Sequence, residues 1–338
     1  MQGYNVAVVG ATGVVGTEMI KVLEETNFPV KKLIPLASER SAGTRIEFKG
    51  ENVKVELLTE DSFKGVDVAL FSAGSSISEK FAPIAVASGA VVVDNTSFFR
   101  MDPNVPLVVP EVNAHDIKKH QGIIANPNCS TAQMVLPLLP IHEHYKITRV
   151  VVSTYQATSG AGKEAMDEML DQTISIVNGN GPTKPRKFTK QIAFNVIPHI
   201  DSFLENGFTK EEMKMTNETK KIFGDDSIEV VATCVRVPAF IGHSESINIE
   251  TEKPFDIEKV KELISKVPNV KVMDDNANNV YPTPIDCVDT NDTLVGRIRR
   301  DFSVKNGIAL FCVSNNLRKG AAFNAVQIAL ELVEQELI

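Results

Sequence analysis

The chain has 338 residues, of which 43% are hydrophobic and 23% charged, and it contains no tryptophan. This composition excludes a disordered chain, and the length favours two domains or one domain with a large insertion. The net charge of −8, without a long basic run, argues against nucleic acid or an anionic membrane surface as a partner, so we expect small-molecule ligands.

The first third of the chain alternates strand-like and helical segments. This alternation predicts βαβ units, and therefore a parallel sheet of the Rossmann type in an α/β domain. The predicted helices are residues 15–26 and 80–88, and the predicted strands are residues 4–9, 33–37, 67–72, 90–95 and 122–125.

From about residue 147 the pattern changes to β-rich segments separated by amphipathic helices. We expect an α+β catalytic and dimerisation domain with a mostly antiparallel sheet. Residues 321–338 have helical spacing and are expected to pack back on the first domain. The predicted division is therefore 1–128 with 318–338 and, inserted between them, 129–317. Residues 178–190, rich in Gly, Pro and Lys, are predicted to form a loop.

Membrane-spanning and secretory signals are not apparent in the sequence. Apolar runs fall short of the ~20 residues of a membrane span, and the N-terminus lacks a charged region followed by a cleavage site, so we expect a cytoplasmic protein. The 4 cysteines have no metal-binding or disulfide spacing, so free thiols and no metal are expected.

The segment GATGVVG, with Gly10, Gly13 and Gly16, follows the first predicted strand and opens a helix. Missing side chains let the backbone turn tightly and approach a pyrophosphate at the helix N-terminus. In this context the pattern favours a dinucleotide site, and the alternative is a tight turn without a ligand.

The end of the second predicted strand bears on the choice between NAD and NADP. An acidic residue there accepts the ribose 2′-OH of NAD, whereas NADP needs hydroxyls and a cation for its 2′-phosphate. Ser38, Arg40 and Ser41 supply the second set, and Glu39 is the contrary sign. We favour NADP, with Glu39 turned to solvent.

Cys129 lies in ANPNCSTAQ, between residues with turn chemistry and a long apolar segment suited to a buried helix. At a helix N-terminus, backbone N–H groups and the helix dipole favour the thiolate over a thiol of free pKa near ~8.5. The alternative is a small buried hydrophobic side chain. A thiolate beside a nicotinamide suggests attack on an aldehyde, hydride transfer and a thioacyl intermediate.

Such chemistry also needs a proton shuttle. His142 and His144 follow Cys129 in the same predicted helix, where core or surface roles are expected. His243 lies in a turn with Pro and Gly between two strand-like runs, close in sequence to Arg236, and is the candidate acid/base.

Six strings carry a resemblance to a known family: GATGVVG, NTSFFRMDPNVPLVVPEVN, NPNCSTAQM, TYQATSGAGKEAMDE, CVRVPAFIGHSE and NNLRKGAAFNAVQIA. They occur in this order in aspartate-β-semialdehyde dehydrogenases, and the chain resembles bacterial members from its first strand to its last helix. The resemblance implies NADPH-dependent reductive dephosphorylation of L-aspartyl-4-phosphate to L-aspartate 4-semialdehyde and phosphate. It also implies a place in lysine, diaminopimelate, threonine and methionine biosynthesis, and a homodimer or tetramer whose interface lies on the β-rich face.

The resemblance implies a role for each matching residue. Cys129 is the nucleophile, His243 the acid/base and Gln156 the residue that orients the substrate. Arg236 resembles the carboxylate-binding arginine, for which a bidentate guanidinium is suited. The remaining substrate residues are Arg100 and Lys214 for the phosphate and Glu212 for the amino group. Without the resemblance, Glu212 and Lys214 are read as an exposed helix face.

The cofactor is expected to contact the glycine loop, the ends of the next strands and two segments of the second domain. One of Asn315 and Asn316 is expected near the nicotinamide amide, and Asn316 is the candidate. The predicted cofactor-binding residues are Gly10, Ala11, Thr12, Gly13, Val14, Val15, Ser38, Arg40, Ser41, Ser72, Gly74, Ser159, Gly160 and Asn316.

Two alternatives remain open. An N-acetyl-γ-glutamyl-phosphate reductase has a similar fold and a Cys/His pair. Its substrate, however, has no free ammonium group that could bind the carboxylate of Glu212. A catalytically silent NADP-binding paralogue would not need Cys129, Gln156, Arg236 and His243 intact.

Overall fold

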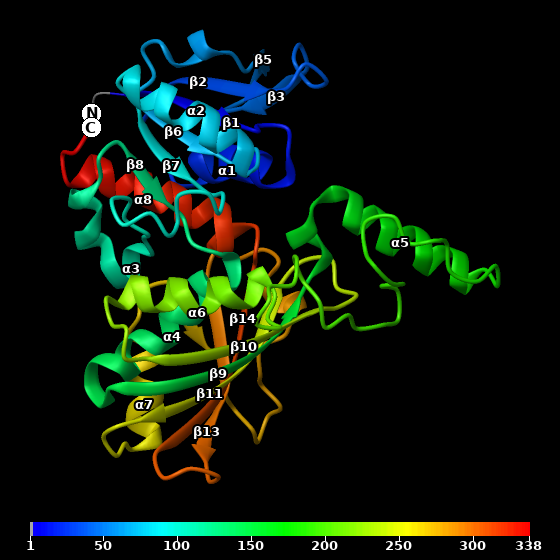
Figure 1. Ribbon diagram of the computed structural model, residues 1–338, viewed down its shortest axis with the longest axis vertical. Helices are drawn as coiled ribbons and strands as arrows, with labels where there is room; N and C mark the ends of the chain where they lie inside the picture. The colour runs from blue at the N-terminus through cyan, green and yellow to red at the C-terminus, as the bar shows by residue number, and fades with distance from the viewer. Residues whose placement is uncertain (1–2) are drawn as a thin grey trace. The chain divides into compact units, whose positions relative to one another are not determined.

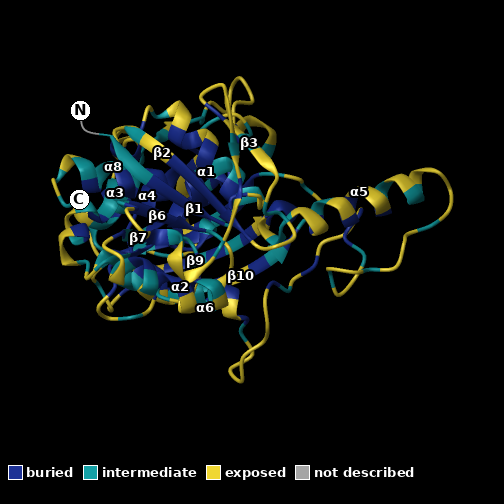
Figure 2. Cartoon of the chain, turned by 90° about the horizontal axis from the view of Figure 1, so that it is seen from above, coloured by how far each residue is buried: buried dark blue, intermediate teal, exposed yellow. Residues whose placement is uncertain are grey.

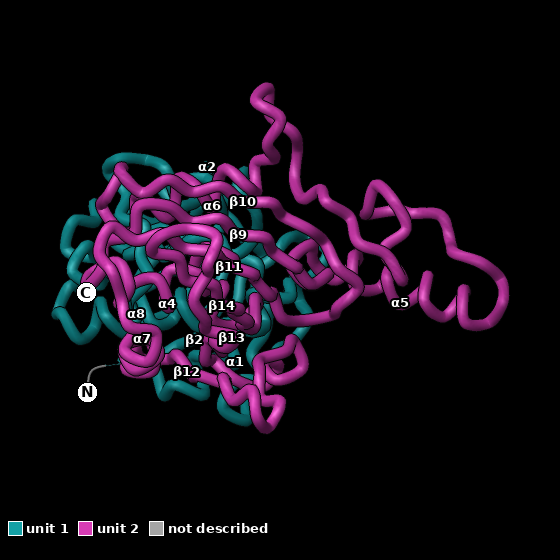
Figure 3. The backbone as a smooth tube through the Cα atoms, turned by 90° about the horizontal axis from the view of Figure 1, so that it is seen from below, with its two compact units in different colours: residues 1–128, 321–338 teal, residues 129–320 magenta. Residues whose placement is uncertain are grey.

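The computed structural model describes residues 3–338 and divides the chain into two compact units (Figure 3). Unit 1 combines the chain up to Asn128 with Ala321–Ile338, and unit 2 is Cys129–Gly320. The boundary predicted from the sequence placed the return to the first domain at residue 318, and the structural units place it at residue 321.

Unit 1 contains a parallel sheet with the strand order β5-β2-β1-β6-β7-β8. All four residues of β6 are buried, as expected for a parallel strand covered on both faces. The predicted parallel sheet is confirmed, whereas the β3–β4 hairpin was not predicted. The strands of unit 1 are β1 (Tyr4–Val9), β2 (Val30–Ala37), β3 (Arg45–Phe48), β4 (Glu51–Lys54), β5 (Glu56–Leu57), β6 (Val68–Phe71), β7 (Val91–Asp94) and β8 (Ile123–Ala125).

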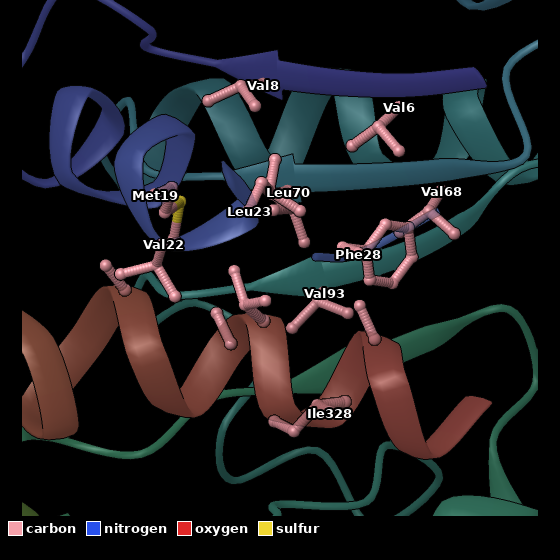
Figure 4. Packing of buried hydrophobic residues seen from close by; sticks show 14 of the residues in the cluster. Val6, Val8, Met19, Val22, Leu23, Phe28, Val68, Leu70, Val93 and Ile328 are labelled. Carbon is pink, nitrogen blue, oxygen red and sulfur yellow. The ribbon is translucent and has the colours of Figure 1, made fainter. Parts of the chain in front are cut away.

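Helices cover both faces of this sheet (Figure 1). On one face, α1 (Val14–Glu25) packs against β1, and α8 (Phe323–Glu334) packs against β6, β7 and α1 (Figure 4). On the other face, α2 (Ser75–Ala87) packs against β6 and β7. The C-terminal helix therefore belongs to the core of unit 1, as its apolar spacing predicted.

Unit 2 contains a sheet with the strand order β10-β9-β11-β14-β13-β12. The sheet is mixed, because β9 pairs with β10 and β12 with β13 in parallel, whereas β9–β11, β11–β14 and β13–β14 are antiparallel. The prediction of a mostly antiparallel sheet did not include the parallel edge pairs. The strands are β9 (Ile147–Gln156), β10 (Glu229–Arg236), β11 (His243–Thr251), β12 (Val270–Val272), β13 (Thr293–Asp301) and β14 (Gly307–Ser314).

Three helices pack on one face of this sheet through a shared apolar core: α4 (Cys129–Tyr145), α6 (Lys210–Phe223) and α7 (Ile257–Ile264). Helix α5 (Lys163–Val177) extends away from the sheet and exposes many of its side chains (Figure 2). The predicted loop at residues 178–190 contains no helix or strand. The short helical turns of the chain are Glu60–Phe63, Pro110–Asn113, Ala114–Lys119, Thr158–Ala161, Pro284–Cys287 and Arg318–Ala322. Within residues 3–338, none of the helices has the length and apolar character needed to span a bilayer.

Phe28 is fully buried between α1 and β2 and offers a test of the unit 1 core. Phe28→Ala is expected to lower the free energy of unfolding by about 3–5 kcal/mol, because the lost ring leaves a cavity that the neighbours fill only in part. Urea unfolding monitored by circular dichroism measures this loss. Phe302, which is 87% exposed, provides the control, since Phe302→Ala is expected to change stability by less than about 0.5 kcal/mol.

Candidate active site

A glycine-rich turn joins β1 to α1 in unit 1. Gly10 has a φ of +86°, which favours glycine. A Cβ on Gly16 would lie 2.1 Å from the carbonyl oxygen of Gly10, so the helix approaches the turn this closely only because that side chain is missing. The loop therefore has the tight turn and close helix–strand packing of a dinucleotide-binding loop.

A cavity of about 610 Å³ lies in unit 1 beside the carboxyl ends of β1, β2 and β6. Open parallel sheets bind their ligands at this edge. Half of the predicted cofactor residues line the cavity, namely Gly10, Thr12, Gly13, Ser38, Arg40, Ser41 and Ser72.

The backbone and side chain of Ala11 are both engaged elsewhere. Its amide donates to the carbonyl oxygen of Leu36 and its side chain is fully buried in the core, and its contact with the cofactor stays a prediction. Val14 and Val15 open α1 and Gly74 precedes α2, and their contacts with a cofactor stay predictions.

The end of β2 presents Ser38, Glu39, Arg40 and Ser41 to the same cavity. A guanidinium with two hydroxyls suits a ribose 2′-phosphate, which carries charge and several acceptor oxygens. Glu39 is exposed but also lines the cavity, so the expectation that it turns away is only partly met. The residues present fit NADP.

Arg100 is the other predicted ligand-binding residue of unit 1, and backbone carbonyls hold it in place. Its Nε donates to the carbonyl oxygen of Asn126 and its Nη2 to that of Asn95, each at 2.9 Å. The side chain is buried, so the guanidinium is held in one orientation.

Three predicted residues of unit 2 meet at one edge of the mixed sheet. Gln156 is the last residue of β9, Arg236 is the last of the parallel β10, and His243 is the first of the antiparallel β11. Arg236 pairs with Gln156 in register, and the β9–β11 register places His243 on the other side of Gln156. The predicted turn is the connection of residues 237–242 between β10 and β11, and His243 follows it as the first residue of the strand.

The turn that follows β9 holds Arg236 and His243 together. The amide of Ala157 donates to His243 Nδ1 at 3.1 Å, and Arg236 Nη1 donates to the carbonyl oxygen of Ala157 at 2.7 Å. A Cβ on Gly160 would lie 3.0 Å from both Arg236 Nη1 and His243 Nε2. The absence of a side chain at Gly160 therefore leaves space beside both groups.

His243 is a buried, neutral imidazole. Burial lowers its pKa well below the ordinary value, and the charge of Arg236 lowers that pKa further. Because Nδ1 accepts a hydrogen bond, the neutral ring carries its hydrogen on Nε2. Within residues 3–338, Nε2 is buried without a hydrogen-bond partner, so it is available to donate to a bound molecule.

Cys129 is the first residue of α4, which confirms the predicted helix N-terminus. Burial lowers the pKa of Arg236, while the negative charges of Glu211 and of the Cys129 thiolate raise it. The thiol therefore lies within electrostatic reach of the guanidinium. Helix N-termini and neighbouring cations are the settings in which cysteines become nucleophiles.

Glu211, rather than Glu212, faces this edge. Both carboxylate oxygens of Glu212 have structural partners, since they accept from the amides of Thr209 at 2.7 Å and Cys234 at 3.1 Å. Glu211 instead accepts from Gln156 Nε2 at 3.3 Å and from Lys214 Nζ at 3.2 Å. These contacts favour Glu211 over the predicted Glu212 as the acid of the site.

The sequence itself indicates that Glu212 has a structural role. Thr209 and Glu212 have the spacing of a capping box, in which the glutamate bonds back to the N-cap amide of its own helix. Lys214 also pairs with Asp201 at 2.9 Å, so its ammonium lies between two carboxylates.

Asn315 and Asn316 have separate roles. Asn315 supports the chain locally, because its Nδ2 donates to Val288 and its Oδ1 accepts from Leu317. Asn316 exchanges hydrogen bonds with Ser159 at 3.0 and 3.2 Å. The two predicted cofactor residues Ser159 and Asn316 are therefore in contact within unit 2.

Gly320 was not predicted as a site residue. It lies in the π-helical turn Arg318–Ala322, and a Cβ there would lie 2.6 Å from Cys129 Cβ. Such turns are frequent at functional sites. Across residues 3–338, no group of three or more His, Cys, Asp or Glu is arranged to hold a metal ion.

Two family models match the chain. The model "Semialdehyde dehydrogenase, NAD binding domain" matches residues 5–120, and "Semialdehyde dehydrogenase, dimerisation domain" matches residues 138–319. Together with the fold, they define a two-domain semialdehyde dehydrogenase, an oxidoreductase that binds its nicotinamide cofactor in the first domain.

Individual relatives specify the family further. Aspartate-semialdehyde dehydrogenase of Aquifex aeolicus is 55% identical and that of Bacillus subtilis 53%, with 99–100% of each chain covered. The crystal structure of aspartate semialdehyde dehydrogenase II from Vibrio cholerae, complexed with ASA, has a TM-score of 0.96 and 49% identity over 99% of both chains. The chain belongs to the aspartate-semialdehyde dehydrogenase family, and its cofactor is NADP.

Gly320→Ala tests the close approach to Cys129. The added methyl is expected to displace the Cys129 side chain and lower kcat at least about tenfold, since a displacement of 1 Å in a reacting group costs ~100-fold. Steady-state turnover and the rate of Cys129 alkylation measure the effect. Gly179→Ala, where φ is +79° and nothing lies near the added Cβ, is a control for general backbone strain. An unchanged alkylation rate in Gly320→Ala would contradict the proposed contact.

Proposed function

We propose that the chain catalyses the reversible NADPH-dependent reductive dephosphorylation of L-aspartyl-4-phosphate through a thioester on Cys129. The products are L-aspartate 4-semialdehyde and phosphate. The placement of Cys129 at the N-terminus of α4 is the observation that supports the proposed intermediate. Membership of the family supports the assignment of this reaction, which serves the biosynthesis of lysine, diaminopimelate, threonine and methionine.

The covalent step uses residues of unit 2. The Cys129 thiolate forms a bond to the acyl carbon while the bond from that carbon to the phosphate oxygen breaks, leaving a thioester and inorganic phosphate. When bound, NADPH supplies the hydride that reduces the thioester carbon. The tetrahedral oxyanion then expels the Cys129 thiolate and leaves the aldehyde. The thiolate is regenerated unchanged, and the one proton that the overall reduction consumes is taken up from solvent by the departing phosphate.

His243 Nε2–H donates a hydrogen bond to the substrate oxygen on which negative charge develops. A buried donor aimed at this oxygen stabilises the transition state more than a solvated donor does. The neutral state of His243 favours this role, and its predicted action as an acid and base stays a prediction.

The charged groups divide among the parts of the substrate. Arg236 binds the α-carboxylate and Glu211 binds the α-ammonium, while Gln156, bonded to Glu211, orients the acyl group. Arg100 and Lys214 bind the phosphate. A carboxylate beside the guanidinium favours a substrate with a free amino group over an N-acetylated one.

A homodimer is the proposed assembly. Unit 2 matches a family model that is named for dimerisation. The sheet face opposite α4 exposes Tyr155, and α5 exposes Leu170, Ile174 and Val177, of which Val177 is 72% exposed. Apolar side chains grouped in this way are typical of protein interfaces. The tetramer and the cytoplasmic location expected from the sequence stay predictions.

The reaction is tested by NADPH formation from L-aspartate 4-semialdehyde and NADP, with and without phosphate. The wild type is expected to require phosphate, and Cys129→Ala is expected to lose at least about 10⁴-fold in rate because the nucleophile is removed. Cys287→Ala, which removes a buried thiol elsewhere in unit 2, is expected to retain turnover.

Other outcomes identify the alternatives. NADPH formation without phosphate would indicate a hydrolytic aldehyde dehydrogenase. Absence of turnover in the wild type would indicate either the N-acetyl-γ-glutamyl-phosphate reductase or a silent paralogue, which the N-acetylated substrate then separates.

The same change at two adjacent residues tests the assignment of Glu211. Glu211→Gln is expected to lower kcat/KM by about 10- to 100-fold, mainly through KM, because a hydrogen bond to a charged group contributes about 1.5–3 kcal/mol. Glu212→Gln is expected to keep kcat/KM close to the wild-type value, since glutamine also completes a capping box. Its stability is expected to fall, because the single amide oxygen cannot accept from both Thr209 and Cys234. A larger loss at Glu212 in steady-state kinetics would return the role to that residue.

A further inference from the structure

Glu245 is a fully buried carboxyl group directly behind His243. It lies two residues further along β11, so its side chain points to the same face of the sheet, toward α4. Its cross-strand neighbours are Thr154 of β9 and Cys312 of β14. Nowhere in residues 3–338 does Glu245 form an ion pair, which is unusual for a buried acid.

Gln133 of α4 is the polar group that faces this carboxyl. Its Nε2 donates to the carbonyl oxygen of His243 at 3.2 Å. Its Oε1 and both oxygens of Glu245 are buried, and none of the three has a hydrogen-bond partner in the part of the chain that the structure describes. If Glu245 were ionised, all three atoms would be acceptors without a donor. One proton on Glu245 removes this conflict, because the carboxylic acid then donates to Gln133 Oε1.

The surroundings favour the protonated acid. Burial raises the pKa of Glu245 well above its ordinary value, and contact with the Gln133 side chain offsets only part of this increase. The titratable groups that face it are the thiols of Cys312 and Cys234 and the imidazole of His243. Burial raises the pKa of both thiols and lowers the pKa of His243, so all three are neutral near pH 7.

We propose that Glu245 is a positioning residue: its carboxylic acid donates to Gln133 Oε1, and Gln133 in turn donates to the backbone carbonyl of His243. Gln133 lies one helical turn after Cys129 on α4, and His243 begins β11. The chain of hydrogen bonds therefore fixes the helix that carries the nucleophile against the strand that carries the imidazole. The inference rests on the proposed function, because it assigns the reaction to these two groups.

Three variants test the proposal in the full-length protein. Glu245→Gln keeps the shape and offers an amide N–H to Gln133 Oε1, whereas Glu245→Met keeps the approximate length and cannot donate. Thr251→Val is the matched control, because it removes a buried hydrogen-bonding side chain at the far end of β11. The measurements are kcat and KM, the alkylation rate of Cys129 by iodoacetamide, and the melting temperature.

Glu245→Met is expected to lower kcat by about 10- to 100-fold with KM changed less than about threefold, since the reacting groups move but the substrate contacts stay. Glu245→Gln is expected to restore kcat to within about threefold of the wild type, at the same pH. Thr251→Val is expected to leave kcat and alkylation unchanged, even where its melting temperature falls.

Wild-type kcat in Glu245→Met, or an equal loss in Glu245→Gln, would overturn the proposal. The equal loss would mean that an ionised carboxylate is required. An infrared difference spectrum between the wild type and Glu245→Gln provides an independent measurement, in which the carbonyl band of a neutral carboxylic acid must appear at pH 7. Alkylation needs no substrate, so a changed rate in Glu245→Met supports the positioning even if phosphate-dependent turnover is absent from the wild type.

Discussion

The register of β11 against β9 is the constraint on which the catalytic edge of unit 2 depends. It sets His243 beside Gln156, which itself pairs with Arg236. A slip of one residue would turn His243 and Glu245 to the opposite face of the sheet, because side chains alternate along a strand. The contact from Gln133 to the His243 carbonyl connects this register to α4. The position of Cys129 and the strand register are therefore parts of one arrangement.

The charged groups at this edge of unit 2 also have a defined arrangement. Arg236 is buried beside Glu211 and within reach of the Cys129 thiolate, while His243 stays neutral. The Arg236 guanidinium suits the carboxylate of a ligand, and the Glu211 carboxylate suits its ammonium group. A protonated His243 would be a second buried cation and would increase the free energy needed to keep the Arg236 guanidinium charged, since like charges in a low-dielectric site repel strongly.

Unit 1 uses a different physical principle, in which backbone geometry rather than buried charge makes the site. Gly10 and Gly16 permit the turn and the close approach of α1, and the cavity beside the strand ends is lined by glycines, small hydroxyl residues and apolar side chains. Arg40 is the basic residue among those that line this cavity, and its contact with the 2′-phosphate stays a prediction. The position of a cavity at the carboxyl edge follows from the parallel connections of the sheet, so it was predictable from the βαβ pattern.

The sequence alone determined the features that are encoded within a few residues: the parallel strands, the glycine turn, the returning C-terminal helix and the helix that begins at Cys129. Tertiary structure decided which of Glu211 and Glu212 faces the site, that His243 begins a strand, and that Gly320 and Glu245 lie against the catalytic groups. Periodicity and turn chemistry act locally, whereas the Gln156–Glu211 and Gln133–His243 contacts join residues 55 and 110 positions apart through strand register and helix packing. Only the folded chain brings them together.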